Sequence, residues 1–377
     1  MSKQPHTTAP EIAGAAIDAV EETALLKDPS TTSTTTAAST SEASASAAIA
    51  SATSPTTTAS TTKPAKKRRH RTFEQTPNRM IFGALLVLLG GSLWGINGSV
   101  AKTIMTDYAV SPLWYACVRQ TIAGVIFLVV SAFTARRQLV GAVKDVRAYP
   151  KYILTAFVCV ALEQVAYLYV IQYTNGGTAT VLQTVNLIMV LAYVCFAARR
   201  WPHWRETLGI VMAFCGVVLL ATGGNITTLA MPLPALIWGL ISAFSAACLA
   251  IVPLKFIVRW GDMVVNGITF FLAGLMLVPF VQPWRNIPQF DLRGWLLFSF
   301  TVVVGTFMAF WFFMAGMSIV GSLRGALLST AEPIVATITS VAWNGAVFSG
   351  ADLCGIGLII LMVFVIQHKP AIAKETA

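Results

Sequence analysis

The stretch RAYPKYILTAFVCVALEQVAYLYVIQYTN, residues 147–175, is mostly apolar and has a counterpart further along the chain. A shift of 146 positions places it without a gap on RGWLLFSFTVVVGTFMAFWFFMAGMSIVG, residues 293–321. Either stretch is long enough to cross about 30 Å of hydrocarbon as a helix. The same shift places Glu206 on Asp352. The sequence therefore predicts an internal repeat built from membrane helices.

The composition indicates that the solvent of this chain is a lipid bilayer. Of the 377 residues, 56% are hydrophobic and only 11% are charged, which is too apolar for soluble domains of this size. Ten apolar segments of about 20 residues follow one another, at 80–101, 112–134, 150–172, 176–197, 206–223, 234–255, 262–281, 294–316, 321–343 and 351–367. We expect an all-α integral membrane protein with ten transmembrane helices.

The repeat contains an odd number of helices, and this fixes the relation between its two copies. We assign five helices to residues 79–224 and five to residues 234–368. Because five is odd, the two copies insert with opposite orientation and form an inverted repeat. Such repeats place a substrate site near the midplane and work by alternating access.

The residues on either side of the helices predict the orientation. Residues 1–78 are rich in Ser, Thr and Ala and hold too few large apolar residues to fold, so we predict a disordered cytoplasmic tail. Its basic run KPAKKRRHR at 63–71 adjoins the first span, which favours a membrane anchor over nucleic-acid binding. Lys and Arg gather in every second connection. Both termini, including the short tail at 369–377, should therefore be cytoplasmic in a plasma-membrane protein.

Several segments resemble the EamA-type members of the drug/metabolite transporter superfamily. They include GSLWGINGSVAK in the first helix, SPLWYACVRQTIAG in the second, GGTATVLQTVNLIMVLAY in the fourth and LRGALLSTAEPIVATI in the ninth. The resemblance covers about residues 80–368 and rests on the whole ten-helix layout. It implies a five-plus-five inverted repeat and transport of small metabolites, often amino acids and often outward, without naming a substrate.

Glu332 is the candidate that we would examine first. It lies about 16 Å into the ninth segment, near the midplane, where an ionisable group is costly and usually functional. Pro333 removes a backbone donor there, so we expect a kink that frees the carbonyl of Ser329 beside the Ser329 hydroxyl and the Glu332 carboxyl. These groups could bind a cationic substrate group or carry a proton. The alternative is a structural kink whose Glu is held by a neighbouring helix.

Three other charged residues lie within the predicted spans. Arg324, one turn from the cytoplasmic end, either snorkels to the headgroups or lines an inner vestibule. Arg119 lies about two turns below the outer surface and could bind a carboxylate or phosphate of the substrate. Alternatively, Arg119 forms a permanent pair with Glu163 in the third segment.

Neutral side chains supply weaker candidates. Tyr167 lies four residues after Glu163, on the same helical face, where an aromatic ring can pack on a substrate. The repeat pairs Gln183 with Ser329 and Asn186 with Glu332, so a cavity between the halves would use both, although hydrogen bonding between helices is an equally good explanation. Trp94 is a further candidate, against the commoner use of membrane aromatics in packing.

The absent patterns limit the chemistry. All four His residues fall outside the apolar segments, no mid-depth Asp pair exists and no GxxxxGK[ST] motif is present, so we predict no metal, no cofactor and no ATP hydrolysis. We predict a secondary transporter and not an enzyme, acting on small molecules as a monomer or homodimer and coupled to protons or running as a facilitator. A passive channel and a membrane enzyme for lipid-linked substrates are the alternatives.

Overall fold

The computed structural model describes residues 77–225, 227 and 229–367. The tail predicted over 1–78 lies outside these residues, except for Pro77 and Asn78, with which the first helix begins. The basic run at 63–71 and the tail at 369–377 also lie outside them. Within the described residues, every regular element is a helix.

Eight helical stretches of the described residues are long and apolar enough to span a membrane. They are α2 (Pro77–Asp107), α3 (Pro112–Thr134), the run of η1 (Val146–Ala148), α5 (Tyr149–Leu154), η2 (Thr155–Ala161) and α6 (Leu162–Tyr173), the pair α7 (Gly176–Thr184) and α8 (Asn186–Ala197), α9 (Trp204–Thr222), α10 (Leu233–Ile251), α12 (Asp262–Val281), and the run of α13 (Leu292–Val302), η3 (Val303–Met308) and α14 (Ala309–Val320).

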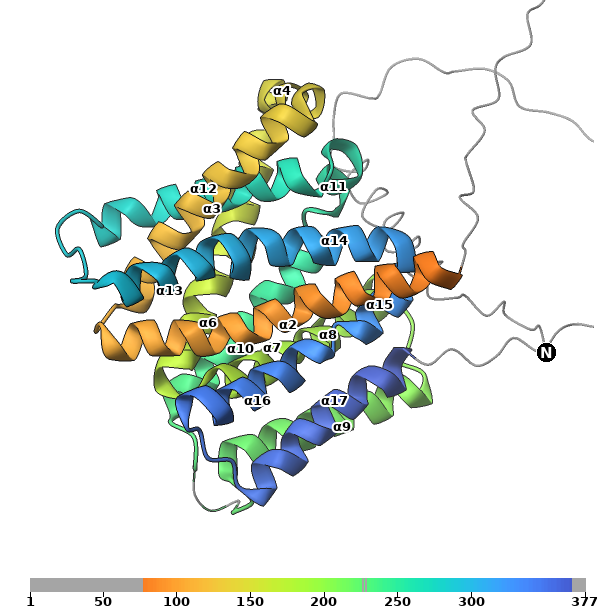
Figure 1. Cartoon of the computed structure of the whole chain (residues 1–377). Coiled ribbons are helices and arrows are strands. Elements are labelled where there is room, and N and C mark those ends of the chain that lie inside the picture. The colour runs from red at the N-terminus through yellow and green to blue at the C-terminus, as the bar shows by residue number, and fades with distance from the viewer. Residues whose placement is uncertain (1–76, 226, 228, 368–377) are drawn as a thin grey trace, which may run out of the picture.

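Shorter helices complete the bundle. The predicted ninth segment forms two helices, α15 (Ser322–Leu328) and α16 (Ala331–Asn344), and the last segment forms the shorter apolar helix α17 (Gly350–Gln367). Two connecting helices, α4 (Arg136–Lys144) and α11 (Leu254–Trp260), lie at the end of the bundle where α2 begins (Figure 1). We call this the proximal end and the end near Asp107 the distal end.

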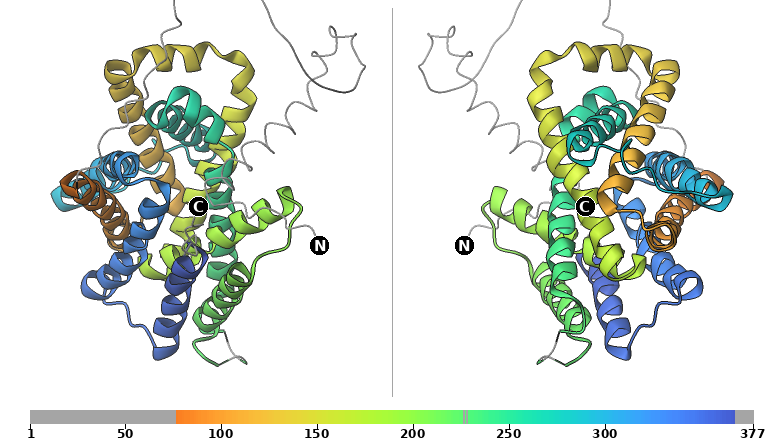
Figure 2. Two further views of the ribbon diagram at one scale, coloured as in Figure 1. Left: turned by 90° about the vertical axis from the view of Figure 1, so that its right-hand side faces the viewer. Right: turned by 90° about the vertical axis from the view of Figure 1, so that its left-hand side faces the viewer.

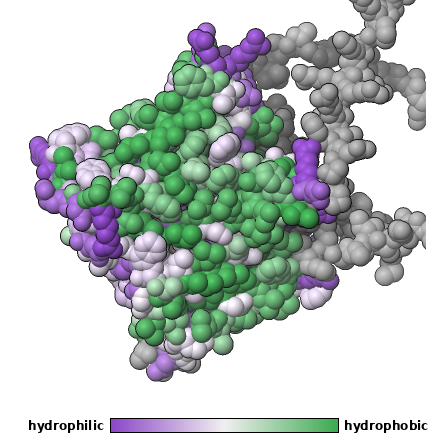
Figure 3. Space-filling view, in the orientation of Figure 1, coloured by the Kyte–Doolittle hydropathy of each residue, from purple (hydrophilic) through white to green (hydrophobic). Residues whose placement is uncertain are grey.

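The helices pack in pairs whose members are far apart in sequence. Helix α2 packs against α14 and α16, α10 packs against α6 and against α7 and α8, α3 packs against α12, and α9 packs against α17 (Figure 1). Seen along the bundle, the α9–α17 pair lies at one edge and α4 crosses the opposite edge (Figure 2). The broad face of the bundle is apolar and polar residues gather at its two ends (Figure 3). This distribution matches a bilayer around the middle of the bundle.

Glycines allow the paired helices to approach closely. A Cβ at Gly124 of α3 would lie 2.4 Å from the backbone nitrogen of Phe271 on α12, and a Cβ at Gly274 of α12 would lie 2.2 Å from Thr121 Oγ1 on α3. Small residues at such crossings let helix backbones pack by van der Waals contact, which drives helix association in lipid.

The break between α15 and α16 differs from the expected kink. The chain turns at Ser329 and Thr330, so Pro333 lies in the first turn of α16. Proline is tolerated there, because the first amide groups of a helix have no partner within the helix. The expectation that the Ser329 carbonyl is freed is wrong, since it accepts a hydrogen bond of 3.0 Å from the Glu332 amide.

Candidate functional site

A cavity of about 380 Å³ lies between the two halves of the chain. Its walls come from α2, α3, α6, α7, α8, α10, α12, η3, α14, α16 and α17, together with the turn before α16. It brings together most of the residues that the sequence singles out: Trp94, Arg119, Glu163, Tyr167, Gln183, Asn186, Ser329, Glu332 and Pro333.

Arg324 does not line this cavity. Its side chain is exposed at the proximal end, and Nη1 lies 3.9 Å from the sulfur of Met80 at the start of α2. This position agrees with the membrane-anchor interpretation of Arg324 and not with a place in the cavity wall.

Both interrupted helices border the cavity at their breaks. Helix α7 ends at Thr184 and α8 begins at Asn186, while the other break falls at Ser329 and Thr330. Irregular backbone at membrane depth is tolerated where it is buried in protein or lines a wet cavity. The two breaks therefore supply polar backbone and side-chain groups at the middle of the bundle.

Amide side chains hold the Glu163 carboxylate. One carboxylate oxygen accepts a hydrogen bond of 2.6 Å from Gln164 Nε2 and the other accepts one from Gln183 Nε2. Glu163 is only 4% exposed. Because Gln183 lies on α7, this contact ties α6 to α7 and fixes the direction of the carboxylate.

Arg119 is a buried cation without an ion pair. Its side chain is 4% exposed, and its guanidinium carbon lies 5.3 Å from the ring centroid of Tyr115. None of the ion pairs among the described residues includes Arg119, and its Nε has no hydrogen-bond partner there. The permanent pair with Glu163 that the sequence left open is therefore not formed in this structure.

The Glu332 carboxylate also lacks a protein partner. Among the described residues, no hydrogen bond or ion pair reaches it, although it borders the cavity. Helix α2 packs closely on its backbone, since a Cβ at Gly91 would lie 3.8 Å from Glu332 Cβ and one at Gly95 would lie 2.8 Å from the Glu332 carbonyl oxygen. This close packing of α2 on the Glu332 backbone sets the depth of Glu332.

One wall of the cavity is aromatic. The Trp94 ring lies 4.8 Å from that of Phe310, which in turn lies 5.6 Å from that of Phe270. All three rings border the cavity. A ligand would therefore meet aromatic rings as well as charged and amide groups.

Several polar wall residues were not predicted from the sequence. They are Asn97, Gln164, Thr180, Thr184, Thr306 and Thr330. Asn97 is 7% exposed, and its Oδ1 has no partner among the described residues. Spacing could have identified two of them. Asn97 follows Trp94 by three positions and Thr180 precedes Gln183 by three, so each shares a helical face with a predicted site residue.

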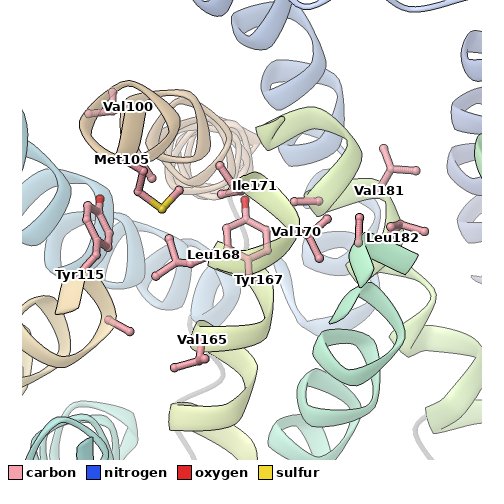
Figure 4. Packing of buried hydrophobic residues seen from close by; sticks show 14 of the residues in the cluster. Val100, Met105, Tyr115, Val165, Tyr167, Leu168, Val170, Ile171, Val181 and Leu182 are labelled. Atoms are coloured by element: carbon pink, nitrogen blue, oxygen red, sulfur yellow. The ribbon is translucent and has the colours of Figure 1, made fainter. Parts of the chain in front are cut away.

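The cavity is closed toward the distal end. Tyr167 Oη and Thr180 Oγ1, whose residues both line it, form a hydrogen bond of 2.8 Å. Beyond Tyr167, the side chains of Val100, Leu168 and Ile171 are at most 1% exposed and pack together (Figure 4). The cavity instead extends toward the proximal end, where it is bordered by Leu249 and by Ala250, which is exposed.

A metal site is not found in the described part of the chain. No group of three or more His, Cys, Asp or Glu side chains could hold an ion there. The six cysteines are free.

A family model and two individual proteins that match this chain are all described as transporters. The model of the EamA-like transporter family matches residues 81–222 and again residues 233–367. The uncharacterized inner membrane transporter YicL of Salmonella typhimurium is 31% identical over 287 residues, which cover 76% of this chain and 95% of YicL. The uncharacterized transporter YwfM of Bacillus subtilis is 23% identical over 292 residues, which cover 76% and 94%.

A solved crystal structure shares the fold. It covers 77% of this chain and 96% of its own, with a TM-score of 0.52 and 16% identity. At this identity the likeness concerns the arrangement of helices alone.

Proposed function

Because the chain belongs to the EamA-like transporter family of membrane proteins, we propose that it is a secondary active transporter that exports amino acids or related zwitterionic metabolites across the plasma membrane by alternating access. Family membership supports transport by a membrane protein. The chemistry of the cavity wall supports the substrate class.

The observation that carries this proposal is a pair of opposite charges in one cavity, neither of which forms an ion pair within the described part of the chain. Arg119 and Glu332 both border it, and neither forms an ion pair among the described residues. A buried unpaired charge is costly, so a ligand that neutralises it gains affinity. A zwitterion would present its carboxylate to the guanidinium, with two parallel hydrogen bonds available, and its ammonium group to Glu332.

The size and the apolar wall of the cavity agree with such a substrate. A volume of about 380 Å³ falls in the usual range for small-molecule sites, roughly 300–1,000 Å³. The rings of Trp94, Phe270 and Phe310 offer an apolar surface to a substrate side chain.

The helix caps support two inverted five-helix repeats that cross the membrane ten times in all. The amide of His203 donates 2.7 Å to the Glu206 carboxylate at the start of α9, and the amide of Ser349 donates 2.8 Å to the Asp352 carboxylate at the start of α17. The shift of 146 positions places His203 on Ser349 and Glu206 on Asp352. Since α9 begins at the proximal end and α17 at the distal end, the same cap occurs at opposite ends of the bundle.

Other features recur with nearly the same shift. The π-helical turns η2 and η3 begin at Thr155 and Val303, and the second parts of the interrupted helices follow Val185 and Thr330. The family model also matches each half once. A repeated unit whose copies are inverted supports a binding site between the copies and a rocking motion around it.

The cations support one orientation of the chain in the membrane. Arg136, Arg137 and Lys144 are exposed on and around α4 at the proximal end. The excess of Lys and Arg at this end supports a cytoplasmic proximal end, with both termini inside. The cavity would then face the cytoplasm, as the first step of export requires.

Glu332 is our candidate for proton coupling. It is the wall carboxylate without a hydrogen-bond partner, whereas Glu163 is held by two amides. A carboxyl that faces each side in turn can exchange a proton with one side and release it on the other.

Transport by purified protein in proteoliposomes tests the proposal. A panel of radiolabelled L-amino acids is offered with and without a pH gradient, beside vesicles that contain the Arg119→Gln variant. We expect at least one member to be moved, and to be moved far more slowly by the variant. If no member is moved under either condition, the amino-acid proposal fails.

A further inference from the structure

The cavity is closed distally by a hydrogen-bonded cluster that no transport step described above uses. Ser99 Oγ on α2 donates a hydrogen bond of 2.9 Å to Thr339 Oγ1 on α16 and lies 3.4 Å from Ser340 Oγ. Ser340 Oγ accepts 2.9 Å from the amide of Gly177 at the start of α7. Ser99 and Ser340 are both fully buried, at 0% exposure.

Asn344 extends the cluster toward the distal surface. Its Nδ2 donates 3.3 Å to the carbonyl oxygen of Ser99 and 3.0 Å to Thr103 Oγ1. The cluster thus joins three helices that lie far apart in sequence, α2, α7 and α16. We call these groups, namely Ser99, Thr103, Thr339, Ser340, Asn344 and the Gly177 amide, the distal lock.

Glycines bring the three helices within reach of one another. A Cβ at Gly98 would lie 3.3 Å from the Gly176 Cα, and one at Gly177 would lie 2.9 Å from the Thr337 Cα. The backbones of α2, α7 and α16 therefore meet directly at the lock, and substrate has no space to pass while it is closed.

No hydrogen-bonded cluster of this kind is found among the described side chains of the other half. An inverted repeat should place the counterpart of the lock at the proximal end, on α10, α15 and α8. A shift of 144 positions, which places Trp94 on Trp238, pairs Ser99 and Thr103 with Ala243 and Ala247. A shift of 146 positions, which places residue 184 on 330, pairs Thr339, Ser340 and Asn344 with Tyr193, Val194 and Ala198. Tyr193 is thus the one polar side chain among these five counterparts. Helix α15 packs instead against α2, α14 and α17.

We propose that the distal lock makes the proximally open state the resting state of the transport cycle, and that it must break for substrate to leave at the distal end. The inference rests on the proposed transport function. Its physical basis is an imbalance between the halves. Buried hydrogen bonds stabilise the distal closure, whereas the counterpart positions are apolar apart from Tyr193, and apolar contacts give no comparable preference within a bilayer.

Hydrogen–deuterium exchange of the full chain in nanodiscs tests the lock without any substrate. The double variant Ser99→Ala/Ser340→Ala removes the hydroxyl contacts among α2, α16 and the Gly177 amide. We expect exchange in peptides that cover α7 and the distal part of α16 to rise about tenfold. Ser131→Ala is the matched control, because Ser131 is also 0% exposed but its hydroxyl has no hydrogen-bond partner among the described residues. Equal exchange in the double variant and the control would overturn the proposal.

A reversible cross-link tests whether the lock must open. The pair Ser99→Cys/Ser340→Cys is introduced in a chain whose six native cysteines are replaced by Ala, and is oxidised with copper phenanthroline. We expect the cross-linked protein to lose transport and to regain it after reduction, while each single-cysteine protein is unaffected by oxidation. Full transport by the cross-linked protein would overturn the proposal that the lock must open. If the wild-type protein moves no panel member, the transport proposal fails, and the exchange experiment still decides whether the lock holds α2, α7 and α16 together.

Discussion

Replacement of Arg119 by Gln removes the cation that we assign to the substrate carboxylate. The side chain is 4% exposed and has no ion pair among the described residues. Its charge is therefore available to a ligand, and its guanidinium carbon lies 5.3 Å from the centroid of the Tyr115 ring. Gln keeps an amide donor of shorter reach but loses the charge and the bidentate geometry.

The loss can be worked out from the contacts that Arg119 offers. Hydrogen bonds to charged groups contribute about 1.5–3 kcal/mol each. A bidentate pair would give about 3–5 kcal/mol, of which the remaining amide of Gln recovers about 1 kcal/mol. We expect the dissociation constant to rise roughly 30-fold to 700-fold, at 1.4 kcal/mol per factor of ten.

Isothermal titration calorimetry on the detergent-purified protein measures this change. The ligands are the amino acid that the transport panel identifies and its primary amide, which lacks the carboxylate. The wild-type protein should bind the amide much more weakly than the acid, whereas Arg119→Gln should bind both alike, and Arg119→Lys should fall between. If Arg119→Gln binds the acid within about threefold of the wild-type protein, which is less than about 1 kcal/mol, the guanidinium is not the carboxylate site.

Three further outcomes follow from other parts of the structure. Glu332→Gln should abolish accumulation driven by a pH gradient while substrate exchange persists, and gradient-driven accumulation at the wild-type level would remove Glu332 from coupling. At the distal end, the Tyr108 hydroxyl donates 2.5 Å to Asp291, and this hydrogen bond is the main cause that holds the pKa of Asp291 below its usual value. The resulting stability is present above the ordinary Asp pKa of about 3.9 and is lost as the pH falls through the lowered pKa, so Tyr108→Phe should lower the melting temperature at pH 7 but not near pH 2. Gly355→Ala should destabilise the protein by about 1–3 kcal/mol, because a Cβ there would lie 2.8 Å from a backbone oxygen of α9, whereas Gly357→Ala on the same helix meets nothing within 4 Å and should be neutral or stabilising in thermal unfolding.

The membrane helices could be predicted because the apolar bilayer offers the backbone no hydrogen-bond partners. An apolar run of about 20 residues has few alternatives to a helix in lipid, since its backbone groups must pair within the segment. For this reason the long apolar helices fall where the composition places them. Their ends are less well determined. Helix α2 continues to Asp107, six residues beyond the predicted end at 101, because polar residues near the interface are tolerated in helical and in irregular backbone alike.

The helix breaks could not be located from local sequence. The break at Val185 carries no Pro or Gly, so it depends on contacts with other helices. Pro333 misled the prediction for a different reason, since the same residue is compatible with a mid-helix kink and with the first turn of a new helix. Only the position of the turn at Ser329 and Thr330 separates these cases.

The candidate site could be predicted in its residues but not in its pairings. The free-energy cost of placing a charge within the membrane identifies Arg119, Glu163 and Glu332, because charged residues rarely persist there without a role. Whether Arg119 meets Glu163 depends on the relative depth and rotation of α3 and α6, which one sequence does not contain. Asn97 was missed because an Asn in a membrane helix more often bonds a neighbouring helix than a ligand.

Counterflow tests the central claim most directly, that one cavity serves the two sides of the membrane in turn. Proteoliposomes are loaded with an unlabelled amino acid that the panel identifies and are diluted into a trace of the labelled compound. A carrier that alternates between two states should accumulate label transiently above its equilibrium level, and the oxidised Ser99→Cys/Ser340→Cys protein should not. Label that rises only to equilibrium, at the same rate in loaded and empty vesicles, would contradict alternating access and indicate a passive channel.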